Sequence, residues 1–131
     1  MKRICIALLP VFFLLLYMEG FAQRKKTGRH IVLLVTAKSH GPGEHEHIKN
    51  AQIIKKMLEN SNIKGLHVAV YKNWPQDPAV MDKADLIMTL SDGRDGESAT
   101  LPQVPFMTPE RMQVMEKQMQ RGCGFITFHF S

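Results

Sequence analysis

Two adjoining stretches decide how this chain folds, His30-Ile31-Val32-Leu33-Leu34-Val35-Thr36 and Ser39-His40-Gly41-Pro42-Gly43-Glu44-His45-Glu46-His47. The first is an apolar run of strand length, and the second is a Gly- and Pro-rich turn that opens a helical pattern from about Glu44 to Ser61. A strand, a turn and a helix in this order predict a βα unit, which places the turn at the carboxyl edge of a parallel sheet. Open α/β folds bind ligands at that edge, so the three histidines and two glutamates of the turn indicate a functional site.

The alternation of strands and helices continues along the chain. Strands are predicted at 66–71, 86–90 and 124–128, and a second helix is predicted between an N-cap at Thr108 and a stop at Gly122. This pattern predicts an α/β fold with a three-layer parallel sheet. No helix follows the fourth strand, so we expect the domain to be truncated there and one face of the sheet to be poorly covered.

Apolar residues at helical spacing predict how the two helices pack. The first helix carries a stripe of four such residues, Ile48, Ala51, Ile54 and Leu58. The second carries Met112, Met115 and Met119, which we expect to pack into the core. Trp74, after the second strand, is expected to cap the core.

The first 22 residues have the pattern of a secretory signal peptide rather than of a folded element. Lys2 and Arg3 precede an apolar segment from Ile4 to Met18, and the small-residue site Gly20-Phe21-Ala22 follows it. We expect cleavage after Ala22, export to the periplasm or the medium, and no membrane attachment of the remaining residues 23–131. We expect those residues to form the N-terminal part of the α/β domain.

Charge and cysteine content narrow the function classes further. The net charge of +5 is scattered, and its one tight cluster, Arg24-Lys25-Lys26, directly follows the cleavage site. A solubilising tail explains this cluster better than nucleic-acid binding does. Signal cleavage leaves Cys123 as the sole cysteine, before a strand expected to be buried, so no intramolecular disulfide can form.

Helical phase separates the candidate residues of the first turn. At 100° per residue, Glu44 and His47 fall on the side of the buried stripe, Glu46 points nearly opposite, and His45 lies on the flank. We therefore select His40, Glu44 and His47 as acid/base candidates. Two glycines of the same turn, Gly41 and Gly43, would let the backbone approach a ligand closely.

Two other strand ends reach the same edge of the predicted sheet. Asp92-Gly93 follows the third strand, and His129 follows the fourth. If the strand order is 2-1-3-4, the first, third and fourth strands lie side by side, so His40, Asp92 and His129 would share one crevice. Asp92 and Gly93 are candidates for substrate binding and His129 for catalysis. A plain Asp-Gly turn and a structural histidine are the alternatives, and His30 and His67 are interpreted as structural strand residues without partners.

A divalent metal ion is left open as a cofactor. Three histidines of the turn, His40, His45 and His47, together with a carboxylate, would suit zinc or a similar ion. Their spacing matches no standard zinc motif, so acid/base chemistry and metal binding remain alternatives.

Four segments together resemble the trehalose-utilisation (ThuA-like) family. They are Ser39-His40-Gly41-Pro42-Gly43-Glu44-His45-Glu46-His47, Asn73-Trp74-Pro75, Leu90-Ser91-Asp92-Gly93 and Gly122-Cys123-Gly124-Phe125-Ile126-Thr127-Phe128-His129. The resemblance covers essentially all of residues 23–131 and implies the class I glutamine amidotransferase-like fold, of which this chain would be the N-terminal portion. His129 stands where true amidotransferases carry a nucleophilic cysteine, so a glutaminase reaction through an acyl-enzyme has no nucleophile here.

The resemblance implies a role in the utilisation of disaccharides or glycosides, including 3-keto sugars, with a small carbohydrate as the ligand. An active protein of this kind would be a carbohydrate-processing hydrolase- or isomerase-like enzyme. A non-catalytic sugar-binding module and an inactive truncated remnant are the alternatives. The oligomeric state is left open.

The signal peptide gives the first testable prediction. When the chain is expressed with its own N-terminus in a bacterium, we expect N-terminal sequencing of the exported protein to begin at Gln23. Exported protein that still begins at Met1 would contradict the prediction.

Overall fold

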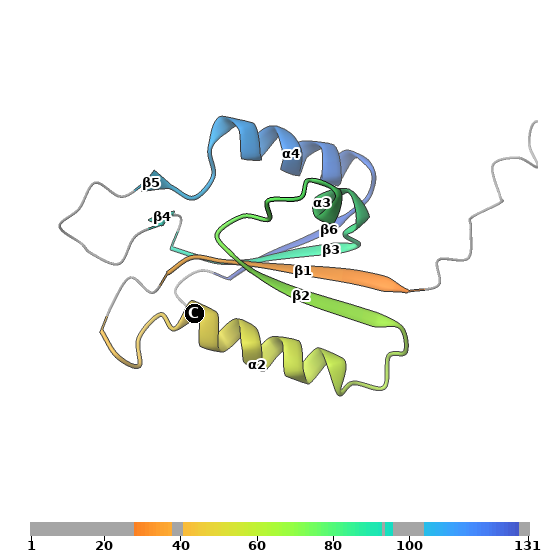
Figure 1. Cartoon of the computed structure of the whole chain (residues 1–131), viewed down its shortest axis with the longest axis horizontal. Helices are drawn as coiled ribbons and strands as arrows, with labels where there is room; N and C mark the ends of the chain where they lie inside the picture. The colour runs from red at the N-terminus through yellow and green to blue at the C-terminus, as the bar shows by residue number, and fades with distance from the viewer. Residues whose placement is uncertain (1–27, 38–40, 93, 96–103, 129–131) are drawn as a thin grey trace, which may run out of the picture.

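The computed structural model of the chain describes residues 28–37, 41–92, 94–95 and 104–128 (Figure 1). Four of its strands form the main sheet: β1 (Arg29–Val35), β2 (Leu66–Lys72), β3 (Leu86–Leu90) and β6 (Gly124–Phe128). Three helices connect them: α2 (His47–Glu59), α3 (Ala79–Lys83) and α4 (Pro109–Gln120). A separate antiparallel pair joins two short strands, β4 (Arg94–Asp95) and β5 (Val104–Pro105).

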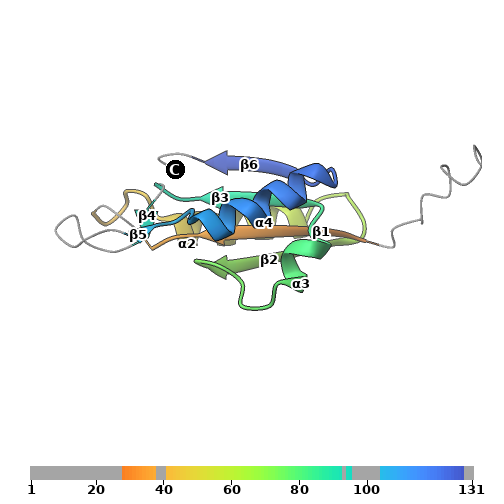
Figure 2. The same cartoon turned by 90° about the horizontal axis from the view of Figure 1, so that it is seen from above.

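The main sheet is entirely parallel, as the sequence predicts, and has the order β2-β1-β3-β6 (Figure 2). Leu33 of β1 lies opposite Val70 of β2 on one side and Met88 of β3 on the other. Helix α2 covers one face of the sheet, while α3 and α4 cover the other (Figure 1). The fold is therefore an α/β, three-layer, flavodoxin-like arrangement.

The sheet has a hydrophobic core on each of its two faces. Strand β1 contributes side chains to both cores, because successive residues of a strand point to opposite faces. Val32 and Leu34 pack on the α3 and α4 side, with Met81, Ile87 and Phe106. The intervening residues of β1 pack on the α2 side, and they are Ile31, Leu33 and Val35. An all-apolar strand is expected where helices cover both faces of a parallel sheet.

Helix α2 begins at His47, three residues later than the predicted start at Glu44. Its inward-facing row therefore begins with the buried His47 ring and continues through Ala51, Ile54 and Leu58. Ile48, one position on from His47, is turned about 100° out of this row and is exposed. The prediction that Ile48 belongs to the buried stripe is wrong for this reason.

Helix α4 begins as the sequence predicts. The Thr108 side chain accepts a hydrogen bond from the backbone N–H of Arg111 at 3.4 Å, and Pro109 occupies the first helical position. The Thr108 side chain thus satisfies one of the backbone N–H groups that lack a partner in the first turn of the helix. Pro109 adds no unsatisfied N–H group there, because proline has none.

The methionine stripe of α4 is only partly a core feature. Met115 is buried and Met119 packs against the core, but Met112 is exposed, so the prediction that all three pack inward is wrong. Met112 reaches toward the edge strand β6, where it lines an apolar hollow with Phe125. Because β6 lies at the edge of the sheet, no further element among the described residues covers this hollow.

The edge strand β6 is itself largely exposed, which contradicts the prediction of a buried fourth strand. Phe125 and Ile126, which point to opposite faces, keep 45% and 42% of their surface exposed. Cys123, just before the strand, is buried. The sheet is thus poorly covered at β6, as the sequence predicts.

A polar network joins α3 to α4. The Asp82 carboxylate accepts hydrogen bonds from Lys117 at 2.8 Å and from Gln118 at 3.0 Å. These bonds hold the pKa of Asp82 below its ordinary value, so the contact is complete near neutral pH and is lost as the pH falls through that lowered pKa. Arg121 adds hydrogen bonds to the backbone carbonyls of Met81 and Ala84 at the end of α3.

Trp74 packs against the core on the α3 and α4 side, beneath the start of α4. Its ring meets Phe106 edge-on at 6.4 Å, and the Arg111 guanidinium lies 5.0 Å from the indole centre. The described residues include no helix that is long and apolar enough to cross a membrane.

The double-sided burial of β1 gives a stability prediction. Leu34→Ala removes a fully buried side chain from the centre of the sheet and should lower the free energy of unfolding by about 2–5 kcal/mol. Met57→Ala, on the exposed face of α2, is the control and should change it by less than about 0.5 kcal/mol. Urea denaturation would measure both, and equal losses in the two variants would contradict this account of the core.

Candidate functional site

Three side chains meet at the carboxyl edge of the sheet: His45, His47 and Asp92, here called the His–Asp cluster. His45 Nδ1 lies 3.0 Å from Asp92 Oδ2, and His47 Nε2 lies 3.5 Å from Asp92 Oδ1. One nitrogen or oxygen from each residue falls within 4.8 Å of the others. Asp92 thus stands between two imidazoles that come from a segment more than 40 positions earlier in the chain.

The pairing of β1 with β3 brings these residues together. Val35 lies opposite Leu90 in the register, and the Thr36 N–H donates to the Leu90 carbonyl at 3.2 Å. The two strands therefore end side by side, so the turn after β1 and the Asp92 position after β3 share one edge of the sheet.

The turn before α2 contains a glycine in a backbone conformation that favours glycine. Gly43 adopts φ +87°, a conformation that side chains rarely allow. His45 also has positive φ, +43°, which is uncommon for a residue with a side chain. The N–H of His47 then donates to the His45 carbonyl at 2.8 Å, which closes the turn at the start of α2.

The His47 ring is fully buried, and its surroundings determine which nitrogen carries the proton. Nδ1 lies 3.2 Å from the Ala37 carbonyl oxygen and 3.2 Å from Thr36 Oγ1. Because a carbonyl can only accept, we assign a proton to Nδ1, which donates to Ala37. In the neutral ring Nε2 then carries a lone pair directed at Asp92, and Nε2 has no hydrogen-bond partner among the described residues.

The two other members of the cluster are partly accessible. The His45 side chain keeps 17% of its surface exposed and Asp92 keeps 11%. The cluster therefore has one fully buried imidazole beneath two groups that a small molecule or an ion can reach.

The structure assembles part of the predicted site. His47 and Asp92 come together as predicted, and the metal candidate His45, placed on the helix flank, joins them. Glu44 does not: it is exposed, because α2 begins at His47 and the helical phase does not extend back to position 44. His40, Gly93 and His129 lie outside the described residues.

The other described residues of the turn are not members of the cluster. Gly41 and Gly43 are exposed, and the Gly41 carbonyl accepts from the Glu44 N–H at 3.1 Å. Glu46 is half-buried, and it accepts from the Gly43 N–H at 3.3 Å while pairing with Lys49 at 3.2 Å. Glu46 therefore stabilises the turn rather than belonging to the cluster.

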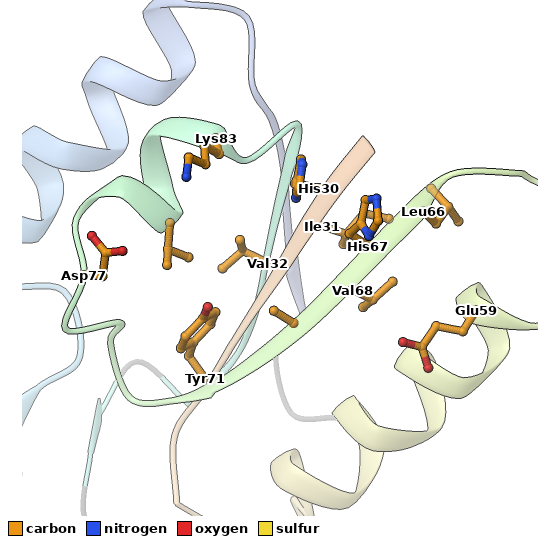
Figure 3. Close-up of a pocket in the computed structure, with 12 residues that line it drawn as sticks. His30, Ile31, Val32, Glu59, Leu66, His67, Val68, Tyr71, Asp77 and Lys83 are labelled. Carbon is orange, nitrogen blue, oxygen red and sulfur yellow. The ribbon is translucent and has the colours of Figure 1, made fainter. Parts of the chain in front are cut away.

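A second hollow, of about 330 Å³, lies along β1 and β2 beside α3 (Figure 3). His30 and His67, partners in the strand register, stack in it with ring centres 5.0 Å apart, so the prediction that they lack partners is wrong. A side chain on Gly28 would come within 2.9 Å of the His67 ring, which explains the glycine there. None of the predicted site residues that the structure describes lines this hollow.

Comparison of the chain with protein-family models, with curated proteins and with solved structures gives no match. The functional argument therefore stands on the His–Asp cluster.

The burial of His47 gives a testable prediction. In His47→Ala the Ala37 carbonyl and the Thr36 hydroxyl lose their partner inside the core, which should lower the free energy of unfolding by about 1–3 kcal/mol. His67→Ala, at an exposed strand position, is the matched control and should change it by less than about 0.5 kcal/mol. Urea denaturation of the two variants measures the difference, and a neutral His47→Ala would show that these contacts do not hold the turn.

Proposed function

We propose that this chain is an exported, ThuA-like protein that acts in the utilisation of disaccharides or glycosides, with 3-keto sugars as its preferred class. The observation that carries the proposal is the contact of Asp92 with His45 and His47 at the carboxyl edge of a parallel sheet. Ligands of open α/β folds bind at this edge. The ThuA-like motifs after β1 and β3 supply two of the segments that meet there.

The cluster supports acid/base chemistry. Asp92 accepts from or pairs with His45 Nδ1 at 3.0 Å, and a carboxylate held at one ring nitrogen orients the other to exchange a proton with a substrate. His45 is the member of the cluster that combines this contact with the larger exposed fraction. We therefore assign His45 the proton transfer, and Asp92 and His47 the positioning of His45 and of the substrate hydroxyls.

The composition of the cluster favours keto sugars over plain glycosides. Hydrolysis of a plain glycoside ordinarily uses two carboxyl groups on either side of the scissile bond. Among the described residues the cluster contains one carboxylate, Asp92, and Glu44 is exposed outside it. A ketone acidifies the neighbouring C–H bond, so a single imidazole base can remove that proton and start cleavage or isomerisation.

The glycines of the turn fit substrate binding. Gly41 and Gly43 are exposed in the same turn as His45 and leave the backbone open to a sugar ring. His40, Gly93 and His129 remain assigned to this site by the sequence motifs.

Turnover of a sugar panel tests the proposal. The full chain is incubated with 3-keto disaccharides and with the corresponding plain disaccharides, and products are measured by chromatography. We expect turnover of the keto sugars, and His45→Ala and Asp92→Asn should lower kcat/KM by about 10²–10⁴-fold. His67→Ala, which lies outside the cluster, controls for general effects of losing a surface histidine.

Each alternative gives a different result in this assay. Binding of the sugars by calorimetry without turnover would favour a non-catalytic binding module. A folded chain that neither binds nor converts any sugar of the panel would contradict the proposal.

A further inference from the structure

We propose that His45, His47 and Asp92 form a binding site for a divalent transition-metal ion of the zinc type. This inference goes beyond the proposed function, because it concerns an ion held by the chain and does not depend on which molecule, if any, is converted. It also changes the ligand set that the sequence suggests, since Asp92, after β3, joins His45 and His47.

The distances of the cluster fit such an ion. Zinc binds imidazole nitrogen and carboxylate oxygen at about 2.0–2.2 Å, which puts two ligands of a tetrahedral site about 3.3 Å apart. The two contacts of Asp92, 3.0 Å to His45 Nδ1 and 3.5 Å to His47 Nε2, lie on either side of this value. The largest separation in the set is at most 4.8 Å, which a small shift of the partly exposed His45 would close.

The surroundings of His47 are those of a metal ligand. Metal-binding histidines donate their other ring N–H to a carbonyl or carboxylate, which fixes the ring and the tautomer. His47 Nδ1 has this contact with the Ala37 carbonyl at 3.2 Å. The lone pair of Nε2 then points into the cluster from a ring that is fully buried and has no hydrogen-bond partner for that atom among the described residues.

Asp92 already has a hydrogen-bonded partner in His45 at 3.0 Å, so an ion pair with Asp92 is the rival explanation for the buried His47 ring. It requires a proton on His47 Nε2 directed at Asp92, but the 3.5 Å separation is too long for a good N–H···O bond. It also places an imidazolium in a fully buried position, which is costly unless the charge is well paired. A cation between the three residues would contact Nε2 and Asp92 together and remove both difficulties.

The ligand types select the class of ion. Two imidazoles and one carboxylate suit zinc, iron, nickel or copper, whereas magnesium and calcium prefer oxygen ligands alone. Three protein ligands would leave a coordination position open, as in catalytic rather than structural zinc sites. The exposed fractions of His45 and Asp92 give the ion and a further ligand a route to that position.

Direct metal titration tests the inference. The full chain is freed of metal with a chelator, and Zn²⁺ alone is added in a calorimeter at neutral pH. We expect equimolar binding, little response to Mg²⁺, and, with Co²⁺ as a spectroscopic probe, visible absorption bands of a site with nitrogen ligands. Zn²⁺ should also raise the thermal unfolding temperature of the chain.

Three variants assign the binding to the cluster. His45→Ala and Asp92→Asn each remove one ligand and should weaken Zn²⁺ binding by about 100-fold or more, beyond the usual loss from removing an outer-shell group. His67→Ala removes one histidine of the exposed His30–His67 stack and should leave the affinity unchanged. Circular dichroism of each variant shows that it is folded, and His45 and Asp92 are chosen because the fully buried His47 carries more of the packing.

The outcomes separate this inference from the proposed function. No equimolar Zn²⁺ binding to the folded chain, binding that Mg²⁺ matches, or binding that survives in both cluster variants would overturn the metal site. Zn²⁺ binding without sugar turnover would support the metal site and count against the sugar chemistry. Sugar turnover by a metal-free chain that binds no Zn²⁺ would support the sugar chemistry and count against the metal site.

Discussion

The parallel pairing of β1 with β3 is the constraint on which the rest of the structure depends. It places β1 in the interior of the sheet, where its side chains supply the core on both faces. The same register ends the two strands level with one another, through the bond from the Thr36 N–H to the Leu90 carbonyl. Asp92 therefore reaches the turn after β1, and the residues that stabilise the domain also set the geometry of the His–Asp cluster.

The periodic spacing of apolar residues in the sequence predicts those parts of the fold that depend on many weak apolar contacts. The four sheet strands and the Thr108 cap follow from apolar runs and capping residues, and the strand order is the one that the predicted site assumes. The features of the fold that this periodicity does not predict depend on single contacts. The start of α2 is set by the positive φ of Gly43 and His45, and neither shows in an apolar pattern. The error of three residues in the helix start misplaces Glu44 in the predicted site, and the inward position of His47 turns Ile48 out of the predicted core.

The sequence likewise predicts some contacts of the candidate site and misses others. Strand order alone brings Asp92 to the turn after β1, so its meeting with histidines could be derived from the sequence. Which histidines it meets could not be derived, because His45 lies before the helix and the backbone of the turn, with its positive φ at His45, sets where that side chain points. The contact of His47 with the Ala37 carbonyl was also missed, since a backbone acceptor has no sequence signal. The level ends of the first and third strands were the available clue to the His45–Asp92 pair.

Packing alone does not account for His47. The inward-facing row of α2 continues with Ala51, Ile54 and Leu58, and an apolar residue at its first position would bury surface without polar groups to satisfy. Two nearby oxygens, from Ala37 and Thr36, satisfy Nδ1, which offsets part of the cost of burying the ring. They leave Nε2 as a buried polar atom facing Asp92 at 3.5 Å. The Nε2 atom of a histidine in this arrangement adds nothing to the stability of the core. The physical reason for a histidine at this position therefore lies in what Nε2 and Asp92 bind together.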